Sequence, residues 1–343
     1  MEAVFKDISI EGIAAVVPDR VEENSRWEDL IGTKRLKRQI RITGVERRHL
    51  PKEGQSAAAT CMEAARLLFS ELKWEPNSLD YLIFVTQFPS FLYPSTAFYI
   101  HKKLGLSKKC VVFDVNLGCS GFTAGIQILS SLMRNMGDRG MLLAGDAEYR
   151  TEDQKNREDY IEHVCEDMLF GVAGSAVALE RKPHSPLYAT QYADGNGYDV
   201  ILRTGEYTKM NGSAVYDFSM DVVAPSITEF KKKYSLADED VDYYVFHQAQ
   251  GLIVNGIGEV CGIPVERNLT CLKDYGNTSS SSIPLALCVN RDRLIESKTV
   301  RLVMCGFGIG LSWATLYAEM DPRRIYPVKI SEWTPEEEDW RYD

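Results

Sequence analysis

The chain has 343 residues, of which 45% are hydrophobic and 26% charged, a balance that excludes disordered and fibrous classes. Its 39 basic and 49 acidic residues give a net charge of −10, which excludes a general nucleic-acid-binding surface because phosphate binding needs clustered positive charge. The length exceeds the usual limit of one hydrophobic core, about 250 to 300 residues, so we expect a molecule built from two halves.

Strand and helix patterns alternate along the chain. Runs rich in β-branched and aromatic residues predict strands at 80–86, 110–115, 141–144, 172–179, 241–246 and 300–305. Periodic apolar patterns predict helices at 56–72, 95–104, 120–136, 224–234, 250–261 and 279–293. This alternation predicts an α/β protein whose sheets are covered by helices on both faces.

Two segments of the chain have the same plan, in which a strand runs through a polar turn into a helix. One begins at residue 110 and the other at residue 241. A polar, proline-bearing connection at 181–186 lies between them. We therefore predict an N-terminal half at 1–183 and a C-terminal half at 184–343. The latter ends in an acidic surface tail from residue 331, with docking of the tail through Trp333 and Trp340 as the alternative.

Targeting and metal-binding signals are weak. The N-terminus lacks the basic start and apolar core of a secretory signal, and the uncharged stretch 115–133 contains polar residues and glycines that suit a buried helix better than lipid. The eight cysteines show no CxxC pair and no zinc-type spacing. We expect no membrane span, no metal, and a reducing, cytoplasmic compartment.

Cys119 is the strongest candidate for a nucleophile. Residues 111–122 read VVFDVNLGCSGF, a strand followed by a glycine-flanked turn and the start of a helix. A cysteine at a helix N-terminus is expected to have a lowered pKa, because the helix dipole and free N–H groups favour the thiolate. The alternative is a buried structural cysteine.

Two further segments offer partners for this thiol. Residues 243–249 read YYVFHQA and place His247 at the end of an apolar strand, where a core histidine is the alternative. Residues 275–282 read YGNTSSSS and place Asn277 in a turn before a helix, where asparagine is also common as a cap. Each signal is weak when taken singly.

Taken together, these segments and the loop GFGIGLSW at 306–313 resemble beta-ketoacyl-acyl-carrier-protein synthase III of the thiolase superfamily. They occur in the same order and at similar intervals, and the resemblance extends from about residue 5 to residue 318. It implies a five-layered αβαβα thiolase-like fold, a homodimer, and acyl thioester substrates on coenzyme A or acyl carrier protein. It implies no cofactor.

The resemblance also assigns roles. Cys119 would form an acyl-enzyme, with the backbone N–H groups of Cys119 and Ile309 as the oxyanion hole. His247 and Asn277 would donate hydrogen bonds to a malonyl-type thioester as carbon dioxide leaves. Four further residues are expected to contact substrate: Phe307 beside the cysteine, Tyr93 reaching into the partner subunit's pocket, Gln248 and Gln250.

Several departures from the family fall on the surface that recognises the acyl donor. The positions of the family's adenine and phosphate contacts hold Arg38, Val164 and Ile42, and a basic residue that docks carrier protein is replaced by Leu252. A basic cluster from residue 34 to residue 48 is a candidate substitute for carrier docking, with a solvated face as the alternative. Its proposed docking residues are Arg35, Arg38 and Arg41.

We therefore interpret the chain as a condensing enzyme that joins an acyl group to a malonyl-type substrate with loss of carbon dioxide, in a specialised pathway. The alternative is an acyltransferase of the same fold that passes the acyl group to an alcohol or amine without decarboxylation. A non-catalytic partner subunit is a third class, and the presence of Cys119, His247 and Asn277 together argues against it.

Overall fold

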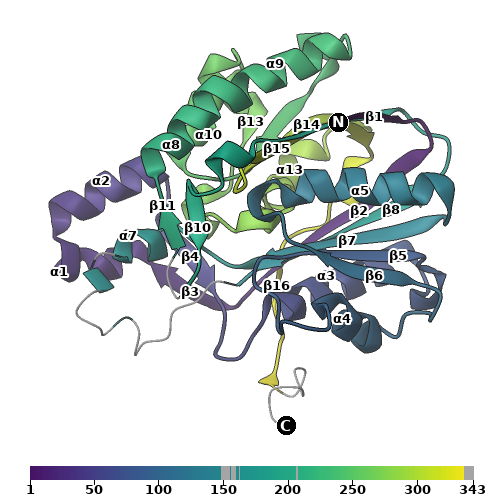
Figure 1. Ribbon diagram of the computed structural model, residues 1–343, viewed down its shortest axis with the longest axis horizontal. Helices are drawn as coiled ribbons and strands as arrows, with labels where there is room; N and C mark the ends of the chain where they lie inside the picture. The colour runs from purple at the N-terminus through teal and green to yellow at the C-terminus, as the bar shows by residue number, and fades with distance from the viewer. Residues whose placement is uncertain (148–154, 156–159, 162, 206–207, 336–343) are drawn as a thin grey trace.

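The structure is a computed structural model that describes residues 1–147, 155, 160, 161, 163–205 and 208–335, and two six-stranded sheets form its framework (Figure 1). The first sheet has the order β16 (Lys329–Ile330), β2 (Ile8–Val17), β8 (Ala173–Arg181), β7 (Arg139–Asp146), β5 (Tyr81–Val85) and β6 (Val111–Val115). The second has the order β1 (Glu2–Phe5), β9 (Leu187–Ala193), β15 (Ser312–Met320), β14 (Val300–Gly308), β12 (Tyr243–Phe246) and β13 (Asn268–Leu269).

The two sheets repeat one topology. In the first, β2, β8 and β7 are antiparallel neighbours, whereas β7, β5 and β6 run parallel. In the second, β9, β15 and β14 are antiparallel, whereas β14, β12 and β13 run parallel. The connection between β8 and β9 contains the proposed division at 183/184, which stays a prediction as a domain boundary.

The terminal strands cross between the sheets. β1 pairs with β9 in the second sheet although it opens the chain, and β16 pairs with β2 in the first sheet although it comes near the end. Each sheet is therefore completed by a strand from the opposite end of the chain.

Helices cover both faces of both sheets, as predicted. On the outer face of the first sheet lie α3 (Ala57–Leu72) and α4 (Thr96–Leu104), and between the sheets lie α5 (Gly121–Asn135) and α12 (Ser282–Val289). The outer face of the second sheet is covered by α8 (Gly212–Phe218), α9 (Ala224–Lys233) and α10 (Gly251–Val260). The thiolase-like αβαβα fold is thus confirmed.

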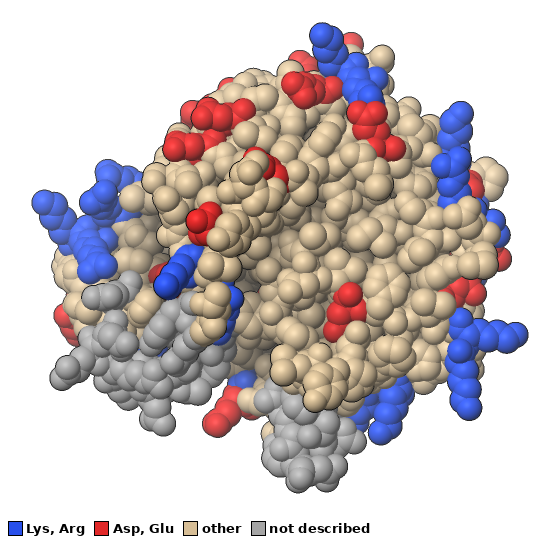
Figure 2. Space-filling view, viewed as in Figure 1, with Lys and Arg blue, Asp and Glu red and all other residues tan. Residues whose placement is uncertain are grey.

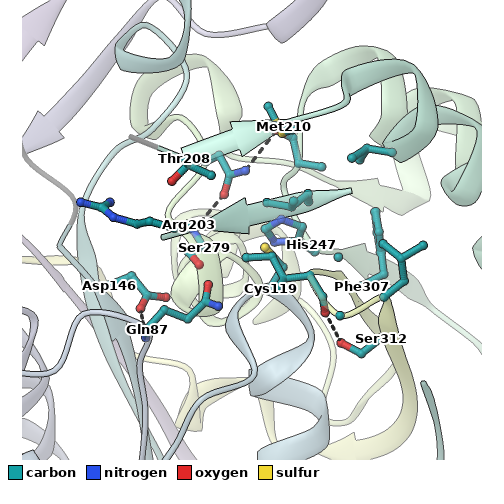
Figure 3. A pocket seen from close by; sticks show the side chains of 18 of the residues that line it. Gln87, Cys119, Asp146, Arg203, Thr208, Met210, His247, Ser279, Phe307 and Ser312 are labelled. Atoms are coloured by element: carbon teal, nitrogen blue, oxygen red, sulfur yellow. Dashed lines mark hydrogen bonds between the residues drawn. The ribbon is translucent and has the colours of Figure 1, made fainter. Parts of the chain in front are cut away.

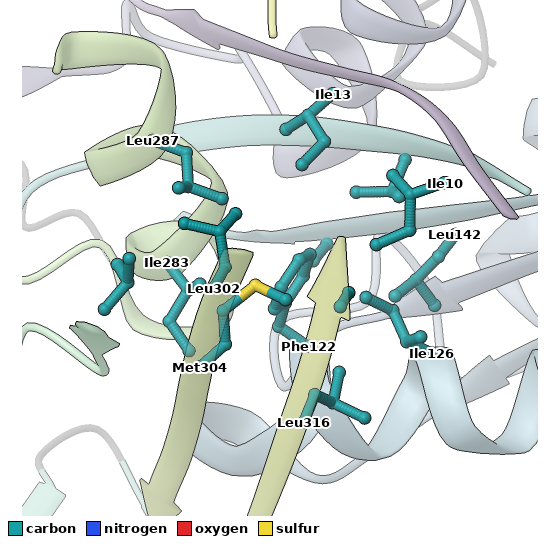
Figure 4. Close-up of a cluster of buried hydrophobic side chains, with 14 of the residues drawn as sticks. Ile10, Ile13, Phe122, Ile126, Leu142, Ile283, Leu287, Leu302, Met304 and Leu316 are labelled. Atoms are coloured by element: carbon teal, nitrogen blue, oxygen red, sulfur yellow. The ribbon is translucent and has the colours of Figure 1, made fainter. Parts of the chain in front are cut away.

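The central core lies between the sheets, around α5 and α12 (Figure 4). α12 is buried along seven consecutive residues, Ser282 to Cys288, as expected for a helix that is apolar on nearly all sides and packed between two sheets. Side chains from α5, α12 and both sheets meet here, namely Phe122, Ile126, Ile283, Leu287, Ile10, Leu142, Leu302, Met304 and Leu316.

Sequence patterns missed several elements. The prediction omitted α2 (Thr33–Thr43), the hairpin strands β3 (Arg20–Glu23) and β4 (Arg47–Leu50), and the hairpin β10 (Ile201–Arg203) and β11 (Thr208–Met210). The helix predicted at 279–293 is divided into η9 (Ser279–Ser281), α12 and α13 (Arg291–Leu294). Among the described residues, no helix is both long and apolar enough to cross a membrane.

The acidic tail is packed at its start, in agreement with the alternative that Trp333 docks it. Ser331 is buried and bonds Glu63, and Trp333 is only 4% exposed. Residues 336–343, including Trp340, lie outside the described part of the chain.

Candidate active site

A cavity of about 650 Å³ lies where the carboxyl ends of parallel strands from both sheets meet. The first sheet contributes residues that follow β5, β6 and β7, and the second contributes residues that follow β12 and β14. Such ends are where open α/β sheets bind ligands. The cavity brings together Cys119, His247, Asn277, Phe307, Ile309 and Gln250 of the predicted site residues.

Cys119 lies in the short helix η3 (Gly118–Ser120) that leads into α5. Cys119, Ser279 and Ile309 line the cavity together, and the hydroxyl of Ser279 and the backbone N–H groups of Ile309 and Cys119 favour the thiolate and so act to lower the pKa of the Cys119 thiol. Gly308 lies against it at φ +153, where a Cβ atom would come within 2.8 Å of the Cys119 Cβ. The close approach therefore requires glycine at this position.

The acidity of Cys119 differs from the expectation. Burial, followed by the negative charge of Asp146, raises the pKa of the Cys119 thiol to about 11. The hydrogen bonds to the sulfur act in the opposite direction but do not outweigh desolvation. The thiol is therefore the main form at neutral pH, in contrast to the lowered pKa that the sequence predicted.

His247 follows β12 and is 2% exposed, edge-to-face with Phe307 at 5.6 Å between ring centroids. Its Nδ1 atom lies 2.8 Å from the Ser282 hydroxyl, which accepts the backbone N–H of Gln248 at 3.3 Å. We infer that Ser282 donates its proton to Nδ1, so that Nε2 carries the ring proton. Burial lowers the pKa of His247 to about 3, and the imidazole is neutral at physiological pH.

Asn277 is held by its own turn. Its Oδ1 accepts the backbone N–H of Ser279 at 2.8 Å, and its Nδ2 donates to the carbonyl of Ala249 at 3.2 Å. Because an amide nitrogen has two protons, one N–H remains available to a ligand in the cavity. The backbone of Asn277 pairs with the segment around Phe170 through bonds to Leu169 and Gly171.

A buried ion pair lies beneath this turn. Arg48 is 1% exposed, bonds Glu22 at 2.7 Å and Asn24 at 3.1 Å, and packs where a Cβ atom on Gly276 would meet it at 3.0 Å. Lys155 approaches the same Glu22 carboxylate at 3.4 Å. Arg48 was expected in the exposed basic cluster, and this is wrong because β4 turns its side chain inward.

Two of the predicted substrate contacts, Gln248 and Tyr93, do not line the cavity among the residues that the structure describes. The structure does not support the predicted substrate contact of Gln248. Its side chain is fully buried, and its amide forms hydrogen bonds with Phe246, Thr270 and Cys271. These bonds connect the end of β12 to the segment that follows β13. Tyr93 is 86% exposed and is not among the described residues that line the cavity.

Sequence reasoning missed several residues of the site. Ser279 adopts φ +50, uncommon for a residue other than glycine, and lines the cavity together with Cys119 (Figure 3). Ser312 bonds both Ser120 and the carbonyl of Ile309 at 2.7 Å, which ties the Ile309 loop to the turn of the nucleophile. The sequence signal for Ser279 was the run of serines after Asn277, for which the sequence suggested no role.

The exposed basic cluster belongs to α2. Figure 2 shows basic side chains at the left edge of the molecule, over α2 in Figure 1. α2 packs on α10, and Gln250, just before α10, lines the cavity. No described acidic residue forms an ion pair with the five basic residues of α2, which are Lys34, Arg35, Lys37, Arg38 and Arg41.

Cys119 at a strand-to-helix turn lines one cavity with a neutral histidine, His247, and with Asn277, the arrangement expected of a condensing enzyme of the thiolase fold. The family profile described as "3-Oxoacyl-[acyl-carrier-protein (ACP)] synthase III C terminal" matches residues 232–320. The beta-ketoacyl-[acyl-carrier-protein] synthase III of Acholeplasma laidlawii is 30% identical over 308 residues, which cover 89% of this chain and 96% of the relative. The chain belongs to the beta-ketoacyl-acyl-carrier-protein synthase III family, whose members are acyltransferases that catalyse condensation.

Solved structures agree with this assignment. The 3-oxoacyl-(acyl-carrier protein) synthase of Burkholderia xenovorans has a TM-score of 0.89 and 28% identity, covering 96% of this chain and 99% of that structure. Cerulenin-bound OleA of Xanthomonas campestris has a TM-score of 0.81 with 18% identity, over 92% of this chain and 97% of that structure, and shows the fold alone.

Proposed function

We propose that this enzyme forms an acyl-enzyme on Cys119 and condenses it with a malonyl-type thioester to give a 3-oxoacyl product. In the first half-reaction Cys119 loses its proton and the thiolate attacks an acyl thioester; the bond from the acyl carbon to the carrier sulfur breaks, and the carrier leaves as a thiolate that takes up a proton in place of the one Cys119 released. The oxyanion of the tetrahedral intermediate accepts hydrogen bonds from the backbone N–H groups of Cys119 and Ile309, two residues that line the cavity.

The second half-reaction uses the other wall of the cavity. The bond from the malonyl carbon to its carboxylate breaks, carbon dioxide leaves, and an enolate develops on the thioester oxygen. His247 Nε2–H and the unused N–H of Asn277 donate to that oxygen. The enolate carbon then attacks the acyl carbonyl and expels the Cys119 thiolate.

The state of His247 is the observation that favours condensation over simple acyl transfer. Transfer to an alcohol or amine needs a general base with a pKa near the working pH. The pKa of His247 is lowered to about 3 by burial, so the ring is a poor base and a good neutral donor. Asn277 supplies the second donor beside it, which an acyltransferase would not need.

The test is incubation with candidate acyl thioesters followed by intact mass and peptide mapping, with a labelled malonyl thioester supplied second. We expect the acyl group on Cys119 alone among the eight cysteines, labelled carbon dioxide, and a 3-oxoacyl product. Acylation should quicken as the pH rises toward 11, because the thiolate fraction grows. Transfer to an alcohol or amine without carbon dioxide release would favour the alternative enzyme.

Carrier docking at α2 is the second part of the proposal. Carrier proteins are acidic, and the five basic residues of α2 lack described acidic partners, so they offer a complementary surface near the cavity. We expect Arg35→Glu/Arg38→Glu to raise KM for a carrier-bound substrate several-fold, with a smaller effect at high salt. Lys6→Glu/Lys298→Glu makes the same charge change elsewhere and is the control. Equal KM values for the carrier-bound substrate in the two double variants would argue against docking at α2.

We also propose a homodimer. β6 is the edge strand of the first sheet, and its Val111 is exposed. Leu92 and Tyr93, which precede α4 in the sequence, are 93% and 86% exposed. Large exposed apolar side chains mark association surfaces in soluble proteins. Sedimentation velocity should show a dimer, and Leu92→Asp should weaken it. Val265→Asp, at another exposed apolar position, should leave the dimer unchanged. A monomeric parent protein would refute the proposed homodimer.

The proposed compartment is the cytoplasm. All eight cysteines lie within the described residues and are free, and a protein with this many unpaired thiols is suited to a reducing environment. Fractionation of the native host, followed by detection of the enzyme, tests this directly.

A further inference from the structure

Gln87 places an amide beside the nucleophile that the condensing reaction does not use. It follows β5, and its side chain lines the cavity. A Cβ atom on Gly118 would lie 2.3 Å from the Gln87 Oε1 atom, so the amide rests on the residue preceding Cys119. The absence of a Cβ atom at Gly118 keeps this space open, and its left-handed φ of +52 also favours glycine.

The hydrogen-bonding capacity of this amide is unused. Among the residues that the structure describes, neither Oε1 nor Nε2 of Gln87 has a hydrogen-bond partner, although its backbone N–H does. An amide that lines a binding cavity without a protein partner can donate to a ligand and accept from it.

Asp146 fixes the backbone of Gln87 in place. At the end of β7, one of its carboxylate oxygens accepts the backbone N–H of Gln87 at 2.6 Å and the Thr86 hydroxyl at 3.2 Å. The other accepts the hydroxyl of Ser280 at 2.8 Å and its N–H at 3.4 Å. Asp146 therefore joins the Gln87 loop to the turn that bears Asn277, with its own acceptor sites filled by the protein.

The position of Gln87 relative to Cys119 indicates which part of the substrate it meets. In Figure 3, Gln87 and Asp146 lie on the side of Cys119 away from Phe307 and Ser312. His247 and Asn277 serve the malonyl thioester in the proposed function. The acyl chain on Cys119 is then the part of the substrate that extends toward Gln87.

We propose that Gln87 is a specificity residue that hydrogen-bonds a polar acyl group, one with a hydroxyl or carbonyl oxygen on its first carbons beyond the thioester. The inference rests on the proposed acyl-enzyme at Cys119. An alkyl chain would exclude water from the Gln87 amide without offering it a hydrogen-bond partner, which costs binding free energy. An acyl group with an oxygen atom at this place supplies the missing partner and should therefore be preferred.

The experiment compares the rates at which pantetheine thioesters of butyrate, 2-hydroxybutyrate and 3-hydroxybutyrate acylate Cys119, followed by intact mass. These probes have the same chain length and lack adenine. We expect one hydroxyacyl thioester to load the parent enzyme about tenfold to a hundredfold faster than butyryl. Gln87→Leu should bring that ratio close to one.

Two further variants make the result decisive. Gln87→Glu keeps a hydrogen-bonding group and should retain part of the preference, which loss of folding would not allow. Gln39→Leu makes the same replacement on α2, at a residue that is not among the described residues lining the cavity, and should leave the ratio of the two rates unchanged.

The outcomes separate the two proposals. A ratio near one in the parent, or a preference that survives in Gln87→Leu, overturns the role of Gln87 while acylation of Cys119 leaves the condensing function standing. Failure of every thioester to acylate Cys119 overturns both.

Discussion

Asn277→Ala is expected to form the acyl-enzyme at Cys119 and to release carbon dioxide from a malonyl thioester about a hundredfold to a thousandfold more slowly than the parent. The variant removes one of two donors to the developing enolate oxygen, a loss of about 2.7 to 4 kcal/mol in comparable oxyanion sites. Labelled-malonyl decarboxylation, measured beside single-turnover acylation, separates the two half-reactions.

Two companion variants define the interpretation. His247→Ala should behave in the same way, because the buried neutral ring acts as the second donor. Asn135→Ala removes an exposed asparagine at the end of α5 and should leave both half-reactions intact. Equal loss of acylation and decarboxylation in Asn277→Ala would contradict a role confined to the second half-reaction.

Glu22→Ala is expected to lower the free energy of unfolding by about 3 to 5 kcal/mol, the usual cost of removing one partner of a buried ion pair. Arg48 is 1% exposed and would keep its charge without the carboxylate that it bonds at 2.7 Å. Denaturant unfolding monitored by fluorescence measures the change. Glu23→Ala is the matched control, because Glu23 is 52% exposed and its pair with Arg47 should contribute at most about 1 kcal/mol.

The same ion pair predicts a pH dependence. Burial alone would raise the pKa of Glu22, but Arg48, Lys155 and Arg26 hold it below the usual value. A depressed carboxylate pKa contributes stability that is complete above the unfolded-state pKa, about 4.3, and is lost as the pH falls further. The stability difference between the parent and Glu22→Ala should therefore shrink in acid, and a difference independent of pH would count against it.

The layered core could be predicted from the sequence because its strands and helices have continuous apolar patterns. β5, β6, β7, β12 and α3 were all predicted to within a few residues of their observed ends. α2 was missed because its charged residues dominate a short amphipathic helix that buries only Leu36 and Thr43. β15 was missed because its Ser, Thr and Glu residues interrupt the apolar run, and its pairing with β14 along nine residues overrides that composition.

The site was predictable only where a residue type and a strand end coincide. Cys119, His247 and Asn277 each follow a strand or precede a helix, so their type and place were visible in the sequence. Ser279, Ser282 and Asp146 act through partners far along the chain, as in the bond from Asp146 to Ser280. Neither the burial of Gln248 nor the rise in the pKa of Cys119 could be inferred, because both depend on the solvent excluded by the assembled cavity.

The crossing of β1 and β16 between the sheets has a consequence for synthesis and for splitting the gene. During translation the first sheet lacks its edge strand β16 until residue 330 has emerged from the ribosome. One side of β2 therefore remains unpaired through almost the whole of synthesis. A gene divided at 183/184 would yield two fragments that each carry the other's edge strand. Each fragment alone would expose the backbone of β2 or β9, an open template for aggregation, so the two are suited to reassembly only when produced together.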